Sequence, residues 1–516
     1  MRLAIIFAGL IILGLLVHTD YGISWDEPQS RLTGLVNAKH LSQTLFPFSS
    51  TAHLNVSDLQ SFRDKDYGVA FELPVVALEQ VLGLQDSRQI YEFRHLMTFL
   101  FFLLGAYALV NLIERRWQSW QWGLVGAGIL ILSPRFFAEA FYNSKDIVFM
   151  SAFVIALATM AAFLQTPSRK TLLLHAFATA FAMNIRIMAV VILATTAAAL
   201  LVQIFKGGTP LRKAAACGAG YALLSYGFFV LLFPYIWDKP ISGFFEVFSN
   251  MSSFRWPYDV LYQGEFINAR DLPWHYAFTW IGITTPILYL GLFAIGLIQL
   301  ARNDRQLLDF ILLGILVATF GAVIYFQSVL YDGWRHLYFL YPIMIYFCVA
   351  ALRLLAPFSW AVIAVHSVFI AIWMWQAHPL QNVYFNALAG NEPRYRWEMD
   401  YWGLANHDAL MHIAEADDRP QISVHAASNT PLLITQRMLP AQQRGRFLFQ
   451  FQPEPTPDYV LSNYRGAEKG HLDRFSDEYV LFHEIEVGGH IILTILQRKP
   501  HSSAATTPSP MATSRK

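Results

Sequence analysis

Adjacent carboxylates follow the first long apolar run of the chain, in the group Ser24-Trp25-Asp26-Glu27-Pro28. A carboxylate that is partly removed from water has a raised pKa and can take a proton from a hydroxyl group, so this group could supply a general base. The spacing also fits the start of a helix, because Ser24 and Glu27 can form a capping box and Pro28 suits a first helical turn. Both interpretations are open at this point.

A second group of charges lies at residues 135–146, in a short connection between two apolar runs. Asn143 or Ser144 could cap the helix that follows, and Asp146 in its first turn would interact favourably with the helix dipole. The group also contains Lys145, and its density of opposite charges and aromatic rings exceeds what a cap requires. It is therefore a second candidate for chemistry.

Cations form the third group: Arg186 in residues 184–188, and Arg335 with His336 in residues 331–336. A single arginine at a membrane surface can reach lipid headgroups or pair with an acid. Taken together, these cations are better explained by an anion. Planar guanidinium groups bind phosphate oxygens in pairs, and a phosphate leaving group requires positive charge while its bond breaks.

The elements that must position these groups are membrane-spanning helices. Hydrophobic residues make up 55% of the 516 positions and charged residues only 14%, whereas about a quarter of the residues of a soluble globular protein are charged. Long apolar runs without charge, the signature of spanning helices, recur along the chain. They predict a polytopic α-helical membrane protein with about 11 transmembrane helices, near residues 3–17, 94–113, 117–133, 147–164, 171–185, 187–205, 214–233, 275–300, 308–330, 336–352 and 357–375.

The charge of the short loops predicts the orientation of this bundle. Lys and Arg favour cytoplasmic loops, and with a cytoplasmic N-terminus most of the loop Lys and Arg residues fall on the inner side. The long polar stretches 18–92, 234–274 and 376–516 then lie on the outer side, together with the three charged groups. Within 18–92, the segments 28–45 and 67–84 are expected to form amphipathic helices that lie flat at the membrane surface.

Residues 1–375 are predicted to form the transmembrane domain. Residues 376–516 carry 28 of the 73 charged residues of the chain, and we expect a soluble α/β domain at 376–500. Its predicted elements are a helix at 407–416, strands at 421–426, 447–451 and 458–462, and a hairpin of strands 479–487 and 490–497 that turns at Gly488-Gly489. Residues 501–516 have low complexity and are expected to be disordered.

Several classes of protein lack support. The net charge is +1, so no basic surface predicts a nucleic-acid partner. Cys217 and Cys348 lie inside apolar runs, where each acts as a small hydrophobic residue. The sequence contains no GxxxxGK, GxGxxG, HExxH or nucleophile-elbow motif, so a nucleotide-using enzyme and a metalloprotease are not supported.

The ordered set of motifs resembles the C superfamily of glycosyltransferases (GT-C), which includes protein O-mannosyltransferases and the lipid A aminoarabinose transferase. The matching segments are Asp26-Glu27 at the start of the first outer loop, Asp146 in the second outer loop, and residues 335–342, 384–388 and 400–403. The last three segments are similar to bacterial membrane members of the mannosyltransferase-like branch. The resemblance covers the whole membrane part of the chain.

The resemblance implies a GT-C-like bundle in the bacterial inner (plasma) membrane, with a periplasmic C-terminal domain, that uses a dolichol- or undecaprenyl-phosphate-linked sugar. The implied reaction is an inverting single displacement onto an acceptor hydroxyl at the outer face, with the polyprenyl tail between helices in the membrane lipid. The C-terminal domain does not resemble the repeat-containing lumenal domain of eukaryotic protein mannosyltransferases. The sugar, and the acceptor, whether lipid, glycan or protein, therefore stay open.

The resemblance also implies roles for the charged residues. Asp26 is the expected base, and Glu27 or Asp146 is expected to orient the acceptor or the sugar. Asp26 and Asp146 could also bind Mg²⁺ or Mn²⁺, which prefer oxygen ligands, but the sequence contains no complete ligand set and the metal is unknown. The carrier phosphate is expected to contact four side chains, Arg186, Arg335, His336 and Lys145.

A transporter or flippase of a lipid-linked or small-molecule substrate is the alternative. Such proteins place ionisable groups near the membrane midplane on interrupted helices and often contain internal repeats, and the sequence shows neither feature. A receptor or scaffold with an outer sensing domain would leave the interfacial acids and arginines without a role. An enzyme that works at the outer membrane surface is therefore the favoured hypothesis.

Overall fold

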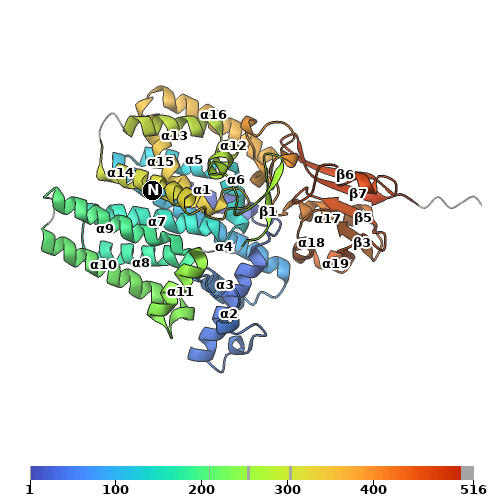
Figure 1. Cartoon of the computed structure of the whole chain (residues 1–516), viewed down its shortest axis with the longest axis horizontal. Helices are drawn as coiled ribbons and strands as arrows, with labels where there is room; N and C mark the ends of the chain where they lie inside the picture. The colour runs from blue at the N-terminus through green and yellow to red at the C-terminus, as the bar shows by residue number, and fades with distance from the viewer. Residues whose placement is uncertain (1, 208–209, 253–255, 301–304, 501–516) are drawn as a thin grey trace, which may run out of the picture.

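The structure is a computed structural model in which a helical bundle joins a smaller domain that contains a β-sheet (Figure 1). It describes residues 2–207, 210–252, 256–300 and 305–500. The segment 501–516, which we predicted to be disordered, lies outside the described residues.

Apolar helices form in all of the segments that were predicted to span the membrane. Two 3₁₀ turns, η3 and η5, lead into helices of the bundle. The bounds are α1 (Arg2–Val17), α4 (Ser87–Trp117), α5 (Trp120–Ile131), α6 (Pro134–Tyr142), α7 (Asp146–Gln165), α8 (Arg169–Ile185), η3 (Ile187–Ala189), α9 (Val190–Phe205), α10 (Leu211–Leu231), α12 (Tyr276–Thr284), α13 (Ile287–Leu300), α14 (Leu307–Tyr325), η5 (Arg335–Leu340), α15 (Tyr341–Leu354) and α16 (Phe358–Gln376).

Seven helices of the described residues are long and apolar enough to cross a membrane, and α5 with α6, bent by 74° at their junction, would form an eighth. The chain is thus a polytopic helical membrane protein, although this count is lower than the predicted 11. Helices α1 and α13 are apolar but shorter. The segment predicted at 275–300 is divided at Thr285-Pro286, because proline lacks a backbone N–H and clashes with the preceding helical turn.

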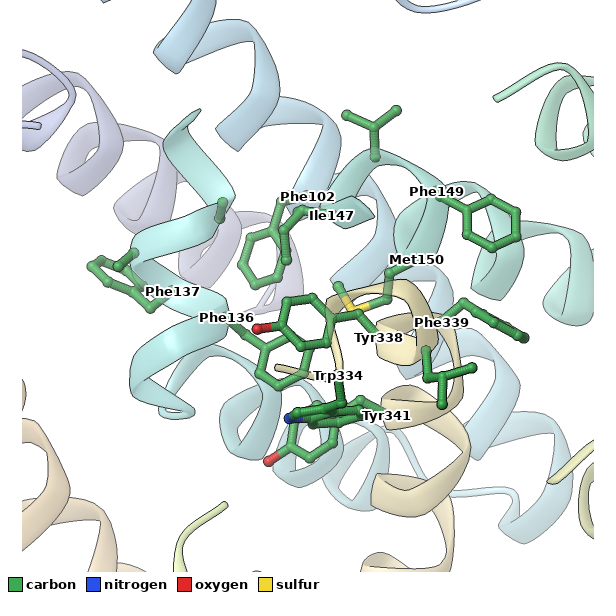
Figure 2. Close-up of a cluster of buried hydrophobic side chains, with 14 of the residues drawn as sticks. Phe102, Phe136, Phe137, Ile147, Phe149, Met150, Trp334, Tyr338, Phe339 and Tyr341 are labelled. Carbon is green, nitrogen blue, oxygen red and sulfur yellow. The ribbon is translucent and has the colours of Figure 1, made fainter. Parts of the chain in front are cut away.

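Aromatic side chains fill the centre of the bundle (Figure 2). Phe136 of α6 stacks on Tyr341 with 4.1 Å between ring centroids and meets the Trp334 ring edge-on at 5.7 Å. Phe339 packs on Phe149 of α7 at 5.1 Å. Such ring pairs contribute about 0.5–1.5 kcal/mol each beyond the burial of their area. They hold η5 firmly against α6 and α7.

Helices α13 and α15 approach closely at Gly296. A Cβ atom at this position would lie 2.0 Å from the carbonyl oxygen of Phe347, so a larger residue requires one helix to shift. Small residues permit this close approach in membrane helices, where packing rather than the hydrophobic effect holds the helices together.

We expect Gly296→Ala to lower the free energy of unfolding by about 1–3 kcal/mol, because the added methyl group forces the two backbones apart. Thermal unfolding of the purified protein in detergent measures the change. Gly291→Ala is the matched control, since a Cβ atom at Gly291, also on α13, has no heavy atom within 4 Å. Equal unfolding midpoints for the two variants would contradict this account of the contact.

The first long loop contains the 3₁₀ turns η1 (Ser50–His53) and η2 (Leu59–Ser61) and two helices, α2 (Glu27–Leu45) and α3 (Glu72–Val81), which pack on each other. Helices were predicted in both segments, and their position flat on the membrane stays a prediction. The loop is tied to the end of α8, where Asn184 Oδ1 accepts the Ala70 N–H at 2.7 Å. The second long loop contains η4 (Pro234–Ile236), α11 (Pro240–Ser252) and the antiparallel hairpin of β1 (Asp259–Tyr262) and β2 (Glu265–Asn268).

The C-terminal domain is built on a five-stranded mixed sheet of order β4-β3-β5-β7-β6. Strand β3 is parallel to β4 and β5, and β7 is antiparallel to β5 and β6. The predicted helix, strands and hairpin are confirmed, and Gly488 and Gly489 have the positive φ angles, 59° and 80°, that a tight hairpin turn requires. The elements are α17 (Ala405–Ala416), β3 (Ile422–Ala426), α18 (Leu432–Thr435), α19 (Ala441–Arg444), β4 (Phe447–Gln450), β5 (Tyr459–Ser462), β6 (Tyr479–Val487) and β7 (His490–Arg498).

Candidate active site

Arg335 lies at the centre of a cluster of charges where the loops meet the bundle. A turn with positive φ at Asp332 (54°) and Gly333 (72°) brings the chain from the end of α14 into η5, which begins at Arg335. The buried guanidinium donates from Nη1 to Asp26 Oδ2 and to Asp146 Oδ2, both at 3.0 Å. Its Nη2 atom donates to Asp332 Oδ2, also at 3.0 Å. One cation therefore holds three carboxylates.

Two aromatic rings complete the surroundings of the Arg335 guanidinium. Its central carbon lies 4.9 Å from the ring centre of Tyr331 and 4.8 Å from that of Trp402. Rings at this distance attract a cation through their electron-rich faces. Tyr331 precedes α15 and Trp402 follows α16, the last helix of the bundle. Segments before and after these two helices therefore both position the Arg335 guanidinium.

Asp146, the first residue of α7, lies between two arginines. One carboxylate oxygen pairs with Arg186 and the other with Arg335, and only 1% of the side chain is exposed. Neither Asn143 nor Ser144 is the N-cap residue of α7, which is Lys145, but Asn143 Oδ1 accepts the backbone N–H of Asp146 at 2.8 Å and so satisfies the first N–H group of the helix. Because Asp146 is enclosed, its carboxylate is suited to orienting the arginines.

Asp26 is the most accessible of the three carboxylates on Arg335. Its side chain is 34% exposed and lines a cavity of about 170 Å³. Burial raises the pKa of this carboxyl group, but the nearby Arg335 and Lys145 cations outweigh burial and hold the pKa below its ordinary value. The raised pKa that the sequence predicted for this carboxyl group is therefore wrong, because the neighbouring cations outweigh burial. Asp26 is ionised at neutral pH and can accept a proton.

The cavity lies between the first turns of α2, the start of α3 and the connection before α7. Lys145 lines it, and the Lys145 Nζ atom stands 3.7 Å from the ring centre of Tyr67, which also lines it. Its remaining wall includes Trp256 and Tyr331, whose rings stack with 4.0 Å between centroids. A carboxylate, an ammonium group and aromatic faces thus share one concave surface.

Of the seven predicted site residues, only Asp26 and Lys145 line this cavity in the described part of the chain. Arg335, Asp146 and Arg186 are joined to Asp26 by ion pairs, whereas Glu27 and His336 lie outside this set of ion pairs. Glu27 turns the other way, where it accepts the Ser24 N–H at 2.8 Å and lies 3.0 Å from His95 Nε2. His336 is half-buried and packs edge-on to Tyr331 at 4.6 Å between ring centres. The roles predicted for Glu27 and His336 stay predictions, and neither side chain lines the cavity.

The predicted capping box is only half formed. Asp26, not Ser24, is the residue before α2, and its side chain makes no cap hydrogen bond. The Ser24 hydroxyl is 3.2 Å from two acceptors, the Glu27 carboxylate and the carbonyl oxygen of Tyr142, and caps no backbone N–H of α2. The part that forms is the bond from the Ser24 N–H to Glu27. The capping interpretation is therefore wrong for Ser24, because its hydroxyl bridges to the end of α6.

No group of three or more His, Cys, Asp or Glu side chains able to hold a metal ion occurs within the described ranges. Asp26 and Asp146, the pair suggested for Mg²⁺ or Mn²⁺, share the guanidinium of Arg335 instead. A metal held by this pair is a hypothesis that the arrangement does not require.

The sequence did not reveal two further members of the cluster, Asp332 and Arg465. Arg465 Nη2 pairs with Asp332 Oδ1 at 2.5 Å, and Arg465 Nη1 donates to the carbonyl oxygen of Tyr401 at 2.8 Å. Asp332 was visible as an acid beside a glycine between two apolar runs. No local signal identifies Arg465, which lies on the connection after β5 and reaches the cluster across more than a hundred residues of sequence.

Glu139 of α6 joins the elements around the cluster through hydrogen bonds. Its carboxylate accepts hydrogen bonds from Tyr338 Oη at 2.8 Å, from Tyr401 Oη at 3.1 Å and from Asn143 Nδ2 at 2.7 Å. These bonds join α6, η5 and the segment before α17, so Glu139 is better explained as a support than as a reactive group.

Glu398 lies beside Arg465, with 3.8 Å between Oε1 and Nε, and burial raises the pKa of its carboxyl group to about 7 from an ordinary 4.5. A raised pKa means that the folded protein binds this proton more tightly than the unfolded chain does. The stability gained from protonation is fully present below pH 4.5 and is lost as the pH rises through about 7.

We therefore expect Glu398→Gln, which imitates the protonated acid, to raise the midpoint of thermal unfolding above that of the wild-type protein at pH 8. At pH 4.5 the two midpoints should nearly coincide. Differential scanning fluorimetry in detergent provides the measurement, with the exposed Glu415→Gln as the control. A Glu398→Gln midpoint at pH 8 that equals the wild-type value would contradict the raised pKa.

Comparison with known proteins agrees with this architecture. No family model and no curated protein matches the sequence. Two crystal structures of ArnT from Cupriavidus metallidurans, one bound to undecaprenyl phosphate and one in the apo state, match 96% of this chain and 98% of that chain. Each has a TM-score of 0.52 and 12% sequence identity. The arabinofuranosyltransferase AftD from Mycobacteria matches 95% of this chain and 41% of that chain, with a TM-score of 0.43 and 13% identity.

The chain therefore has the fold of ArnT over nearly its whole length, from the first helix to the C-terminal sheet. This confirms the predicted likeness to the aminoarabinose transferase branch of the C superfamily at the level of the fold. A fold does not define which reaction occurs at a site, so the function depends on the residues of the cluster.

Proposed function

We propose that this protein is a membrane glycosyltransferase that moves a sugar from a polyprenyl-phosphate carrier to an acceptor hydroxyl. The observation that carries the proposal is that Asp26 lines a cavity together with Lys145 and is paired with the buried Arg335. A general base and phosphate-binding cations are the two functions that this reaction requires. The ArnT fold, in a structure bound to undecaprenyl phosphate, supports the choice of carrier.

In the proposed reaction, the acceptor oxygen attacks the anomeric carbon of the sugar while the bond from that carbon to the phosphate oxygen breaks. The configuration inverts in this single displacement, and the polyprenyl phosphate leaves with the bonding electron pair. Asp26 receives the proton of the acceptor hydroxyl. Lys145 and Arg335 balance the negative charge that develops on the phosphate, which is the largest electrostatic demand of the step.

Donor binding and base activation are coupled in this proposal. Arg335 already contacts three carboxylates, so a phosphate that binds it must displace one of them. Asp26 is the one to leave, because the side chains of Asp146 and Asp332 are only 1% and 6% exposed. Once separated from the guanidinium, the Asp26 carboxylate becomes a stronger base and is free to meet the acceptor.

The proposed location of the reaction is the periplasmic face of a bacterial inner membrane, with the N-terminus in the cytoplasm. The distribution of Lys and Arg among the short loops supports this orientation. Mass spectrometry of lipid that co-purifies with the protein tests the carrier, because a bound polyprenyl phosphate is expected. Uptake of substrate by reconstituted vesicles without sugar transfer would favour the transporter alternative.

Asp26→Asn should lower kcat by about two to four orders of magnitude, the usual contribution of a general base. Affinity for the donor should be kept or increased, because the substitution removes a carboxylate that competes with phosphate for Arg335. Release of polyprenyl phosphate from a panel of polyprenyl-phosphate sugars measures turnover. The control is Asp20→Asn in the same loop, where Asp20 pairs with His378 instead. Retained turnover in Asp26→Asn would refute the base assignment.

Lys145→Gln should weaken the binding of undecaprenyl phosphate by about tenfold or more, since a charge-assisted hydrogen bond to phosphate is lost. Isothermal titration calorimetry in detergent measures the affinity. Lys65→Gln is a suitable control, because the Lys65 ammonium group also stands over a tyrosine ring, that of Tyr235 at 5.3 Å, but does not line the cavity. If both variants bind the lipid with wild-type affinity, Lys145 does not hold the phosphate.

A further inference from the structure

A row of four alternating charges leads from the first loop to the wall of the cavity. Arg31 Nε pairs with Glu79 Oε2 at 2.9 Å, and Arg94 Nη1 pairs with Glu79 Oε1 at 2.8 Å. Arg94 also pairs with Glu72, the first residue of α3. Two positive and two negative charges balance, which reduces the cost of burying them. The row holds the Glu72 carboxylate in a fixed orientation.

The end of this row faces the cavity. Glu72 lines it together with Ser144, and Glu72 Oε1 accepts a hydrogen bond from Ser144 Oγ at 2.7 Å. Ser144 directly precedes Lys145 in the chain, so this pair of oxygens lies beside the proposed phosphate-binding ammonium group. A carboxylate oxygen can accept a second hydrogen bond, and a serine hydroxyl can accept one while it donates another. Unused acceptor sites therefore remain at the cavity wall.

An aromatic surface belongs to the same cavity. Trp256 and Tyr331 stack with their ring planes inclined by only 7°. The Trp256 Nε1 atom is enclosed and has no hydrogen-bond partner among the described residues. Aromatic faces are electron-rich and attract C–H groups that carry partial positive charge. A ligand suited to this cavity thus has hydroxyl groups that donate and accept hydrogen bonds and a C–H face that packs on a ring.

We propose that Glu72, Ser144 and Trp256 form the subsite that binds the sugar ring of the donor, through the sugar hydroxyls. The inference rests on the proposed glycosyltransferase function and deepens it, because it separates recognition of the sugar from recognition of the phosphate. Lys145 and Arg335 bind the phosphate. Glu72 and Ser144 bind the hydroxyl groups of the sugar that is attached to the phosphate. The sugar would then lie between the phosphate and Asp26, as the displacement requires.

The test compares two affinities for each protein: that for undecaprenyl phosphate and that for the best of its mannosyl, glucosyl and arabinosyl esters. We expect the wild-type protein to bind the best ester at least about tenfold more tightly than the bare carrier, the usual discrimination from a few hydrogen bonds. Glu72→Gln should reduce the ratio of the affinity for the best ester to the affinity for the bare carrier toward one. It should leave the affinity for the bare carrier nearly unchanged. Ser144→Ala, which alters no charge, should reduce the ratio in the same direction.

Glu79→Gln is the matched control for Glu72→Gln. Each substitution removes one buried carboxylate from Arg94, but Glu79 does not line the cavity. A purely structural role for Glu72 predicts that the two variants behave alike, with equal losses of sugar discrimination. The subsite predicts that Glu79→Gln keeps the wild-type ratio of affinities even where it lowers thermal stability.

The failures of the two proposals are distinguishable. If the wild-type protein binds undecaprenyl phosphate but shows no preference for any ester, the subsite is refuted while the choice of carrier stands. The subsite is equally refuted if Glu72→Gln and Ser144→Ala both keep the wild-type ratio, or if Glu79→Gln loses it to the same extent. A wild-type protein that binds neither the bare carrier nor its esters would overturn the proposed function itself.

Discussion

The pairing of one buried guanidinium with three carboxylates is the interaction on which the rest of the structure depends. An ion that leaves water without a partner costs several kcal/mol, and removing one member of a buried pair typically costs about 3–5 kcal/mol. Arg335 meets this demand with residues from three separate places: Asp26 before α2, Asp146 at the start of α7, and Asp332 in its own turn. This arrangement holds the first loop against the bundle, and the pair of Asp332 with Arg465 joins the C-terminal domain to the same cluster.

The aromatic core next to the cluster keeps the backbone around the charged side chains rigid. Phe136, Trp334 and Tyr341 pack together in the interior (Figure 2), and they hold the backbone around Arg335 where the carboxylates can reach it. Directional hydrogen bonds to a guanidinium tolerate little displacement, whereas packed rings resist it. The aromatic core holds the backbone in place, and the charged side chains determine which ligand can bind.

Features encoded by local patterns could be predicted from the sequence. Apolar runs gave the helices, and alternating strands with a Gly-Gly turn gave the sheet of the C-terminal domain, since both depend on neighbouring residues. The convergence of Asp26, Asp146, Arg186 and Arg335 was also predictable, because the charge of the short loops predicts that all four stand at helix ends on one side of the membrane. The division between α12 and α13 also has a local signal, Pro286, since a proline inside an apolar run divides a helix.

Other features depend on contacts that no local pattern records. Asp26 and Glu27 are adjacent acids, and only the path of the chain decides that Asp26 meets the cavity and Glu27 meets His95. Arg465 reaches Asp332 from a connection of the C-terminal sheet, and the Arg94 pairs with Glu72 and Glu79 join α4 to α3. Such partners are chosen by the tertiary structure, so their identity appears only once the fold is known.

The contact between Arg465 and Asp332 bears on how the chain matures. Asp26 leaves the ribosome long before Arg465 and the strands around it. A nascent chain that has inserted all of its membrane helices still has Asp332 without its second arginine and Arg335 without the adjacent Trp402 ring. Closure of the cluster therefore waits until the C-terminal sheet has been synthesised and folded, and a chain that stops before Arg465 leaves Asp332 without one of its two arginine partners.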